Sequence, residues 1–210
     1  MKKVIGFDEE FDLILNQLIH NKLSNSLLLT GNKGIGKKYF FSQLIDEYIK
    51  KNISSEQAHH HLSLLKSNTH PNIKIVEKEI DEKTKKLKNF IIIDQIRKIN
   101  QFSLETSVIE NIPKFILIDS ADDMNINASN ALLKILEEPR SNTYFFLISH
   151  QPSLLLPTIK SRCLKINLSN HNYDNFSNII TISNPDIDEE TKKFLYDVTN
   201  GSPGLINKYE

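Results

Sequence analysis

The first chemistry that this sequence suggests is phosphate binding. Thr30-Gly31-Asn32-Lys33-Gly34-Ile35-Gly36-Lys37-Lys38 forms a glycine-rich turn between an apolar run and an amphipathic segment. Glycines at this spacing let consecutive backbone N–H groups face an anion, and Lys37 adds a positive charge. One position departs from the pattern: Lys38 stands where such loops carry a Ser or Thr hydroxyl for Mg²⁺, and an ammonium group cannot ligate a cation.

A carboxylate follows the second strong apolar run, Phe115–Asp119. Strands buried on both faces of a parallel sheet have this composition, and ligands bind beyond their carboxyl ends. Asp119 therefore stands where an acid associated with Mg²⁺ belongs, beside the phosphate loop. An ordinary turn or capping aspartate is the alternative interpretation of Asp119, as a chance glycine cluster is of the loop.

These residues need a scaffold, and the apolar pattern supplies one. Apolar runs that predict strands alternate with helical patterns that begin near Asp8, Lys37, Asp94 and Asn127. The predicted strands are Ser26–Thr30, Ile73–Glu77, Phe115–Asp119, Tyr144–Ser149 and Leu164–Leu168. We therefore expect an α/β fold with a mainly parallel five-stranded sheet over residues 1–168. A small helical domain is expected over residues 169–210, with Phe194, Leu195 and Val198 on one helix face.

Two segments show no such periodicity. The chain from Ile53 to Pro71 is predicted to be a solvated connector, and Lys78–Asn89 an exposed charged turn. The connector region contains His59, His60, His61 and His70, a cluster that suggests a metal. Adjacent histidines cannot all converge on one ion, and no cysteine lies nearby, so no metal site is predicted.

Composition excludes several functional classes. The chain has 210 residues, 39% of them hydrophobic and 25% charged, with a formal net charge of zero. No global field therefore attracts nucleic acid, and no apolar run approaches the roughly 20 residues of a membrane span. The first residues turn acidic before a signal peptide could form. A single cysteine, Cys163, excludes internal disulfides and fits a cytoplasmic protein.

Five motifs carry a resemblance to a known family when taken in order. They are Gly31–Lys38, Ile91–Arg97, Asp119–Asn125, Asn130–Pro139 and Ser161-Arg162-Cys163. Together they resemble the clamp-loader branch of the AAA+ ATPases, and most closely the delta-prime subunits of bacterial DNA polymerase III, from about Val4 to Leu205. The resemblance implies an AAA+ P-loop domain followed by a small helical lid. The collar domain of the family is expected to be absent from this chain.

The same resemblance implies a role. Such subunits help an ATP-driven assembly open the sliding clamp and place it on primed DNA, so the implied partners are other clamp-loader subunits, the clamp and DNA. No membrane is involved. The Ser-Arg-Cys arginine of one subunit reaches ATP held by its neighbour, which makes Arg162 the candidate arginine finger in trans. Such a finger accelerates phosphoryl transfer by about 10³–10⁵. Without the motif, a surface salt bridge is the simpler interpretation of Arg162.

Several departures from the family pattern point to a subunit that does not hydrolyse ATP itself. Besides Lys38, Ser120 stands where hydrolysing relatives have a glutamate, and Gly204 or Leu205 where they have a nucleotide-sensing arginine. The chain is therefore expected to hold ATP without cleaving it. It is expected to be a subunit of a DNA polymerase holoenzyme and to have no ATPase activity of its own. Zinc is not expected, because the four-cysteine module of many relatives is missing.

Three alternatives remain at this stage. An active ATPase would need Asp122 or Asp123 to position water. A P-loop kinase explains the loop but gives no role to Asn130–Pro139 or Arg162. A pure interaction protein would keep the loop for its shape alone. Candidate lysines for DNA contact are Lys33, Lys83, Lys85, Lys86 and Lys88.

Overall fold

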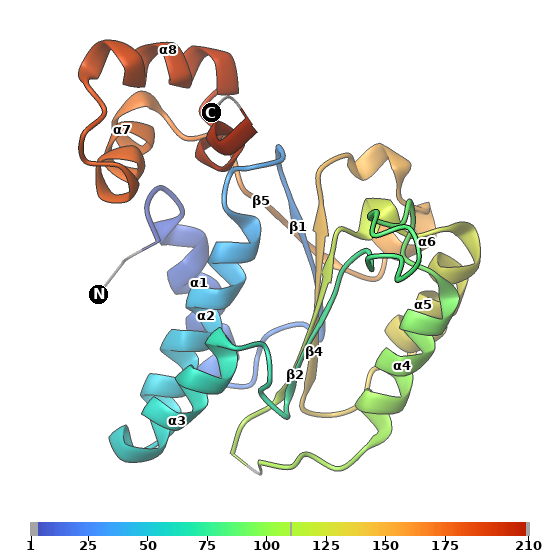
Figure 1. Cartoon of the computed structure of the whole chain (residues 1–210). Coiled ribbons are helices and arrows are strands. Elements are labelled where there is room, and N and C mark those ends of the chain that lie inside the picture. The colour runs from blue at the N-terminus through green and yellow to red at the C-terminus, as the bar shows by residue number, and fades with distance from the viewer. Residues whose placement is uncertain (1–3, 110, 209–210) are drawn as a thin grey trace.

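The chain is built on five parallel strands. The computed structural model describes residues 4–109 and 111–208. The sheet has the order β2-β3-β4-β1-β5, with all neighbours parallel (Figure 1). Its strands are β1 Ser26–Thr30, β2 Ile73–Val76, β3 Lys114–Asp119, β4 Thr143–Ser149 and β5 Leu164–Asn167. Thr30 pairs with Ser149, and Asp119 with Ile148, so the carboxyl ends of the three central strands meet at one edge. The predicted α/β fold and all five predicted strands are confirmed.

Helices cover both faces of the sheet. On one side lie α1 Asp8–Ile19, α2 Lys37–Asn52 and α3 Ser55–Lys66, and on the other α4 Ile93–Leu104, α5 Ile126–Glu137 and α6 Pro157–Lys160 (Figure 1). Short 3₁₀ turns follow β3, β4 and the last α-helix, α8 Glu189–Thr199. They are η1 Ala121–Asp123, η2 Pro152–Leu154 and η3 Pro203–Lys208. Among the described residues, no helix has the length and apolarity that crossing a membrane requires.

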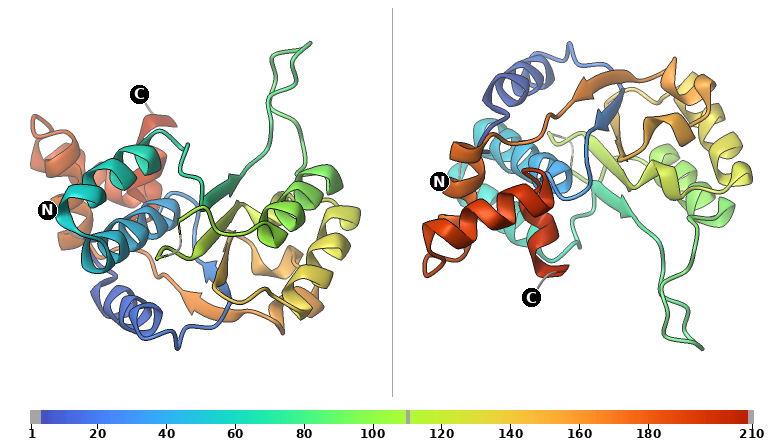
Figure 2. Two further views of the ribbon diagram at one scale, coloured as in Figure 1. Left: turned by 90° about the horizontal axis from the view of Figure 1, so that it is seen from below. Right: turned by 90° about the horizontal axis from the view of Figure 1, so that it is seen from above.

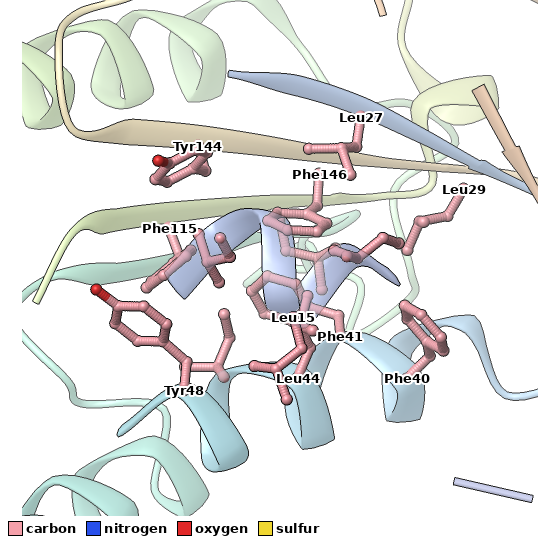
Figure 3. Close-up of a cluster of buried hydrophobic side chains, with 14 of the residues drawn as sticks. Leu15, Leu27, Leu29, Phe40, Phe41, Leu44, Tyr48, Phe115, Tyr144 and Phe146 are labelled. Atoms are coloured by element: carbon pink, nitrogen blue, oxygen red, sulfur yellow. The ribbon is translucent and has the colours of Figure 1, made fainter. Parts of the chain in front are cut away.

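Both faces of the sheet are apolar, because consecutive apolar residues of a strand point to opposite faces. On β4, Tyr144, Phe146 and Ile148 enter the cluster beneath α1–α3, whereas Phe145 and Leu147 enter the cluster beneath α4–α6. Phe146 packs edge-on against Phe41 of α2 with ring centroids 5.0 Å apart (Figure 3). Truncating such a ring costs about 3–5 kcal/mol, so these contacts fix α2 and the loop before it.

Helix α3 corrects one prediction. The segment Ile53–Pro71 is not a solvated connector, because α3 runs through its middle. The helix buries only Ala58, His61 and Leu65, spaced three and four residues apart, against the core beneath it. Because the middle residue of this stripe is His61, the apolar periodicity of a helix is not visible in the sequence. Tertiary packing against α2, rather than local propensity, therefore decides the helix.

Helix α4 begins at Ile93, one residue before the predicted start near Asp94. Asp94 therefore lies in the first turn and does not cap the helix. Gln95 Oε1 accepts a hydrogen bond from the N–H of Ile92 at 3.1 Å, while Asp94 pairs with Arg97 at 2.9 Å. A glutamine three residues into the helix thus satisfies a backbone donor that a capping aspartate would leave to water.

The elements after β5 form a small cluster of their own. Helices α7 Tyr173–Ser183 and α8 Glu189–Thr199 pack with η3 around Phe176, Ile180, Leu195 and Ile206. The face predicted for α8 is wrong for two of its three residues, because Phe194 and Val198 are exposed. The buried stripe instead runs through Lys192, Leu195 and Thr199. The Lys192 side chain is only 8% exposed, and its ammonium pairs with Glu189 at 2.8 Å, so a lysine can occupy this buried position.

The charged segment between β2 and α4 is a projecting hairpin, as predicted for an exposed turn. Ile80 and Leu87 form an antiparallel bridge, and Asp81 Oδ1 accepts hydrogen bonds from the N–H groups of Lys83 and Thr84. In both views of Figure 2 this green segment extends away from the body of the molecule.

Candidate functional site

The phosphate loop lies between the carboxyl end of β1 and the start of α2. Gly31 has φ +143°, and a Cβ added there would stand 2.2 Å from the carbonyl oxygen of Leu168. Gly36 has φ +101° but faces open space. Both positions therefore favour glycine, the first for close packing as well as backbone conformation. The spacing predicted from the sequence is realised as a formed loop.

Lys37 braces this loop from inside. Its Nζ donates to the carbonyl oxygens of Gly31 and Asn32, each at 2.7 Å, and the residue is only 3% exposed. Burial lowers the pKa of Lys37 to about 8, against the opposing charges of Asp119 and Asp122. The ammonium thus has two hydrogen-bond acceptors within the loop itself.

Lys38, at the hydroxyl position of the motif, forms an ion pair with Glu77, the residue directly after β2. Asp119 ends β3 in the same cleft, and burial raises its pKa while the charge of Lys38 opposes the rise. The cleft has a volume of about 420 Å³. Its lining includes Lys33, Gly34, Gly36, Lys37, Lys38, Glu77, Asp119, Asp123, His150 and Leu205. Tertiary structure therefore brings together most of the residues predicted for the loop and Asp119.

The C-terminal turn rests directly on the loop. The N–H of Gly204 donates to the carbonyl oxygen of Gly34 at 2.8 Å. A Cβ on Gly34 would stand 2.8 Å from Leu205 Cγ, so this tail is in close contact with the loop. Leu205 lines the cleft with an apolar side chain, at the place where the resemblance expected a nucleotide-sensing cation in active relatives.

The two acids considered for positioning water both have partners in the chain. Asp122 accepts from Ser149 Oγ at 2.6 Å and from the backbone N–H groups of His150 and Gln151. Asp123 pairs with Lys78 at 2.9 Å and accepts from Ser120 Oγ at 2.8 Å. These bonds tie η1 to β4 and to the hairpin. Each carboxylate therefore has a structural task.

Two cleft residues escaped the sequence analysis. Glu77 directly follows β2, and Asp119 is the last residue of β3. Because parallel strands end at one edge of the sheet, the sequence could have placed Glu77 beside Asp119. His150 follows β4, and its Nδ1 is buried without a hydrogen-bond partner. Burial, and then the charge of Lys37, lower the pKa of His150 to about 4. Its ring is therefore neutral at pH 7.

An apolar cavity of about 850 Å³ adjoins the loop on its other side. Its lining includes Val4, Phe7, Ile35, Tyr39, His171, Ile180 and Ile206. His171 bonds to the carbonyl oxygen of Ile35 through Nε2 at 3.0 Å, which fixes one wall against the loop. A cavity of this lining is suited to a flat, largely apolar group such as a nucleobase.

Arg162 lies elsewhere, on the turn between α6 and β5. Its Nη2 pairs with Glu137 at 2.7 Å, and its Nη1 donates to the carbonyl oxygen of Thr158 at 3.0 Å. The described residues that line the cleft do not include Ser161, Arg162 or Cys163. Burial raises the pKa of Cys163 to about 11, so its thiol stays protonated and unreactive at neutral pH.

The histidines divide into two kinds. His59 and His60 are exposed on α3, while His61 and His70 are buried with ring centroids 5.3 Å apart. Burial lowers the pKa of His70 to about 4. Within residues 4–109 and 111–208, no three His, Cys, Asp or Glu side chains are placed to hold a metal ion together.

Comparison with known proteins now decides the family. Residues 8–172 match the model of a family described as "DNA polymerase III, delta subunit". The chain belongs to this family. The delta' subunit of DNA polymerase III from Pseudomonas aeruginosa is 39% identical over 145 residues, covering 68% of this chain and 42% of that protein. The delta' subunit from Bacillus subtilis is 32% identical over 153 residues, or 72% and 44%. The predicted resemblance to the delta-prime subunits is confirmed.

Solved structures agree on the fold of this delta-prime-like chain. A gamma subunit-related protein of DNA polymerase III from Thermotoga maritima superposes with a TM-score of 0.56 at 21% identity, over 88% of this chain and 58% of that one. The Holliday junction branch migration motor RuvB from the same organism gives 0.56 at 16% identity, over 95% and 58%. At these low sequence identities, the superpositions show a shared AAA+ P-loop fold and nothing about function. The chain spans under half the length of the two delta' relatives.

Proposed function

We propose that this chain acts as a delta-prime-type subunit of a bacterial clamp loader, in the cytoplasm. In this role it assembles with the other loader subunits and helps them place the sliding clamp on primed DNA. It holds ATP without cleaving it, and it donates Arg162 to the ATP bound by a neighbouring subunit. Family membership supports the association with other loader subunits. The phosphate cleft supports ATP binding without cleavage, and the Arg162 turn supports the donation of an arginine to a neighbour.

The observation that carries the proposal is the contrast between the two cationic sites. In the cleft, Lys38 occupies the hydroxyl position and is paired with Glu77, and Asp122 and Asp123 are both bonded to the chain itself. At the surface, Arg162 stands in an intact Ser-Arg-Cys motif outside that cleft. The cleft lacks a hydroxyl for Mg²⁺ and a free acid to position water, so it is not suited to hydrolysis. Arg162 is suited to assist hydrolysis at the site of a neighbouring subunit.

The chemistry of Arg162 suits a finger in trans. A guanidinium stays charged at every physiological pH and can fork onto two phosphate oxygens. Its present partner, Glu137, lies on the surface with 49% of its side chain exposed, so this ion pair is a weak competitor for a phosphate. Such a group stabilises the charge that develops on the transferred phosphoryl group.

ATP retention without cleavage rests on the loop and its neighbouring cavity. Backbone N–H groups of the formed loop suit phosphates, and the apolar cavity beside Ile35 and Tyr39 suits a base. The Mg²⁺ that such folds hold does not fit the residues present, so no catalytic step through a metal is assigned to this chain.

One experiment tests the finger. In an assembled loader whose neighbouring subunit is the only one competent to hydrolyse ATP, we expect Arg162→Ala to slow single-turnover cleavage by about 10³-fold or more. The matched control is Arg97→Ala, which also removes an exposed, ion-paired arginine. An unchanged rate with Arg162→Ala, or an equal loss with Arg97→Ala, would contradict the finger role.

A second experiment tests the cleft. The isolated chain should show no steady-state ATP turnover above that of a Lys37→Ala variant, whereas calorimetry should detect nucleotide binding. Robust turnover that Lys37→Ala abolishes would support the active ATPase instead. Turnover absent and binding absent together would leave the loop as a fold element only.

A further inference from the structure

The cleft contains a cation of its own. P-loop folds of this type bind nucleotide with a divalent ion, held by a hydroxyl in the position of Lys38 and an acid in the position of Asp119. The residues present do not fit that ion. Lys38 offers three N–H donors and no acceptor, and it is paired with Glu77. Asp123, the other nearby carboxylate, is held by Lys78 and Ser120.

We infer that the Lys38 ammonium is a resident counter-ion that replaces the divalent cation in this cleft and keeps divalent ions out. The carboxylates concerned are Glu77 after β2, Asp119 at the end of β3 and Asp123 in η1. Lys38 is paired with the first and acts electrostatically on the second, while the third is paired with Lys78. The inference sharpens the hydrolysis-deficient part of the proposed function, but it concerns this chain alone.

Charge counting explains the exclusion. The carboxylates Glu77, Asp119 and Asp123 are opposed by the ammonium groups of Lys33, Lys37, Lys38 and Lys78, which line the same cleft. Four positive and three negative formal charges leave +1, so a divalent ion entering the cleft would find no net negative charge to attract it. It would also compete with an ammonium that the chain itself holds in place, at a high effective concentration.

The backbone of Glu77 is anchored to the fold, while its ion pair with Lys38 is partly exposed, with 45% and 44% of the two side chains accessible. The backbone carbonyl of Glu77 accepts a hydrogen bond from Gln95 Nε2 at 2.8 Å, which anchors the residue to the start of α4. The Lys38–Glu77 pair therefore ties α2, directly behind the phosphate loop, to the edge strand β2. Side chains of the chain itself therefore link these two elements.

The test restores the hydroxyl and uses metal alone as the probe. Lys38→Thr removes one positive charge, leaves the three carboxylates with the ammonium groups of Lys33, Lys37 and Lys78, and supplies an oxygen ligand. Binding of Mn²⁺ to the full chain is measured by electron paramagnetic resonance, without nucleotide or partner subunits. The matched control is Lys50→Thr, which removes another ammonium paired with a glutamate, far from the cleft in sequence.

We expect Lys38→Thr to bind Mn²⁺ at least tenfold more tightly than the unmodified protein, and Lys50→Thr to match the unmodified protein. Equal Mn²⁺ affinity in the unmodified protein and Lys38→Thr, whether tight or absent, would overturn the inference. So would an equal gain with Lys50→Thr. Circular dichroism verifies folding, and Lys38→Ser replaces Lys38→Thr if the latter does not fold. Because loader subunits are absent, failure here is distinguishable from failure of the proposed role in clamp loading.

Discussion

The phosphate cleft and the Arg162 turn are two cationic sites, and they differ in how deeply one cation is buried: Lys37 lies inside the fold, whereas Lys38 beside it and Arg162 are both partly exposed. Lys37 is 3% exposed and donates to two loop carbonyl groups, while Lys38 is paired with Glu77. The side chain of Arg162 is 34% exposed and has one carboxylate and one carbonyl partner at the surface. A positive charge in a phosphate motif is therefore no proof that the charge is available to a ligand. Lys37 and Arg162 each have two acceptors, so what separates them is burial, with 3% of Lys37 exposed against 34% of the Arg162 side chain.

The difference has an energetic side. An exposed ion pair such as Arg162–Glu137 contributes at most about 1 kcal/mol, so a phosphate can readily replace it. A buried ammonium with two carbonyl partners is harder to move, because each hydrogen bond to a charged group contributes about 1.5–3 kcal/mol.

The largest effect should come from the shape of the Arg162 cation. Arg162→Lys keeps the charge but loses the planar fork, so we expect single-turnover cleavage at the neighbouring site to stay at least about 100-fold slower than with the unmodified protein. Quenched-flow measurement on the assembled loader reports this rate. Recovery to within a few-fold would mean that only charge matters at this position.

A smaller effect should follow from adding one methyl group in the loop. Gly31→Ala meets the carbonyl oxygen of Leu168 and has an unfavourable φ, so we expect a loss of about 2–4 kcal/mol of unfolding free energy. Gly36→Ala has the unfavourable φ but open space, and should lose only about 1–2 kcal/mol. Urea unfolding of both variants gives the comparison. Equal losses would show that backbone strain, not packing on Leu168, restricts the loop.

The neutral imidazole of His150 predicts a pH dependence of stability. Its folded pKa is about 4, below the ordinary value of 6.5, so between these values the unfolded chain binds more protons. Stability from this group is therefore present above pH 6.5 and is lost as pH falls toward 4. We expect His150→Gln to reduce that slope by less than about 1.4 kcal/mol per pH unit, since the ring is half-buried. Parallel slopes in urea titrations at several pH values would refute this.

The smallest effect should be on the stability of the Arg162 turn. Glu137→Gln removes the carboxylate partner of Arg162 at an exposed site, so we expect a loss of less than about 1 kcal/mol by urea unfolding. Cleavage at the neighbouring site should be unchanged or faster, because the guanidinium is then free. A loss of several kcal/mol would show that the pair holds α5 against the turn, and the contrast with the cleft would disappear.

Much of the fold was predictable because its signals are local. The runs around Leu28, Ile116 and Phe145 are apolar at every position, which only strands buried on both faces require. Helix α3 was not predictable, because its buried stripe consists of only three residues, and one of them is His61. Phe194 and Val198 were predicted to share a face with Leu195, whereas the packing of α8 turns Lys192 and Thr199 inward beside Leu195.

The sequence by itself determined the sheet, the phosphate loop, the anomaly at Lys38 and the Ser-Arg-Cys motif that contains Arg162. Residue type and short-range spacing encode these features, since a glycine loop and a buried strand need particular residues wherever they occur. Only the tertiary structure decided that Lys38 meets Glu77, that Gly204 closes on Gly34, and that Arg162 stays outside the cleft. Those contacts join residues far apart in the chain, and their partners are set by how the strands align and the helices pack.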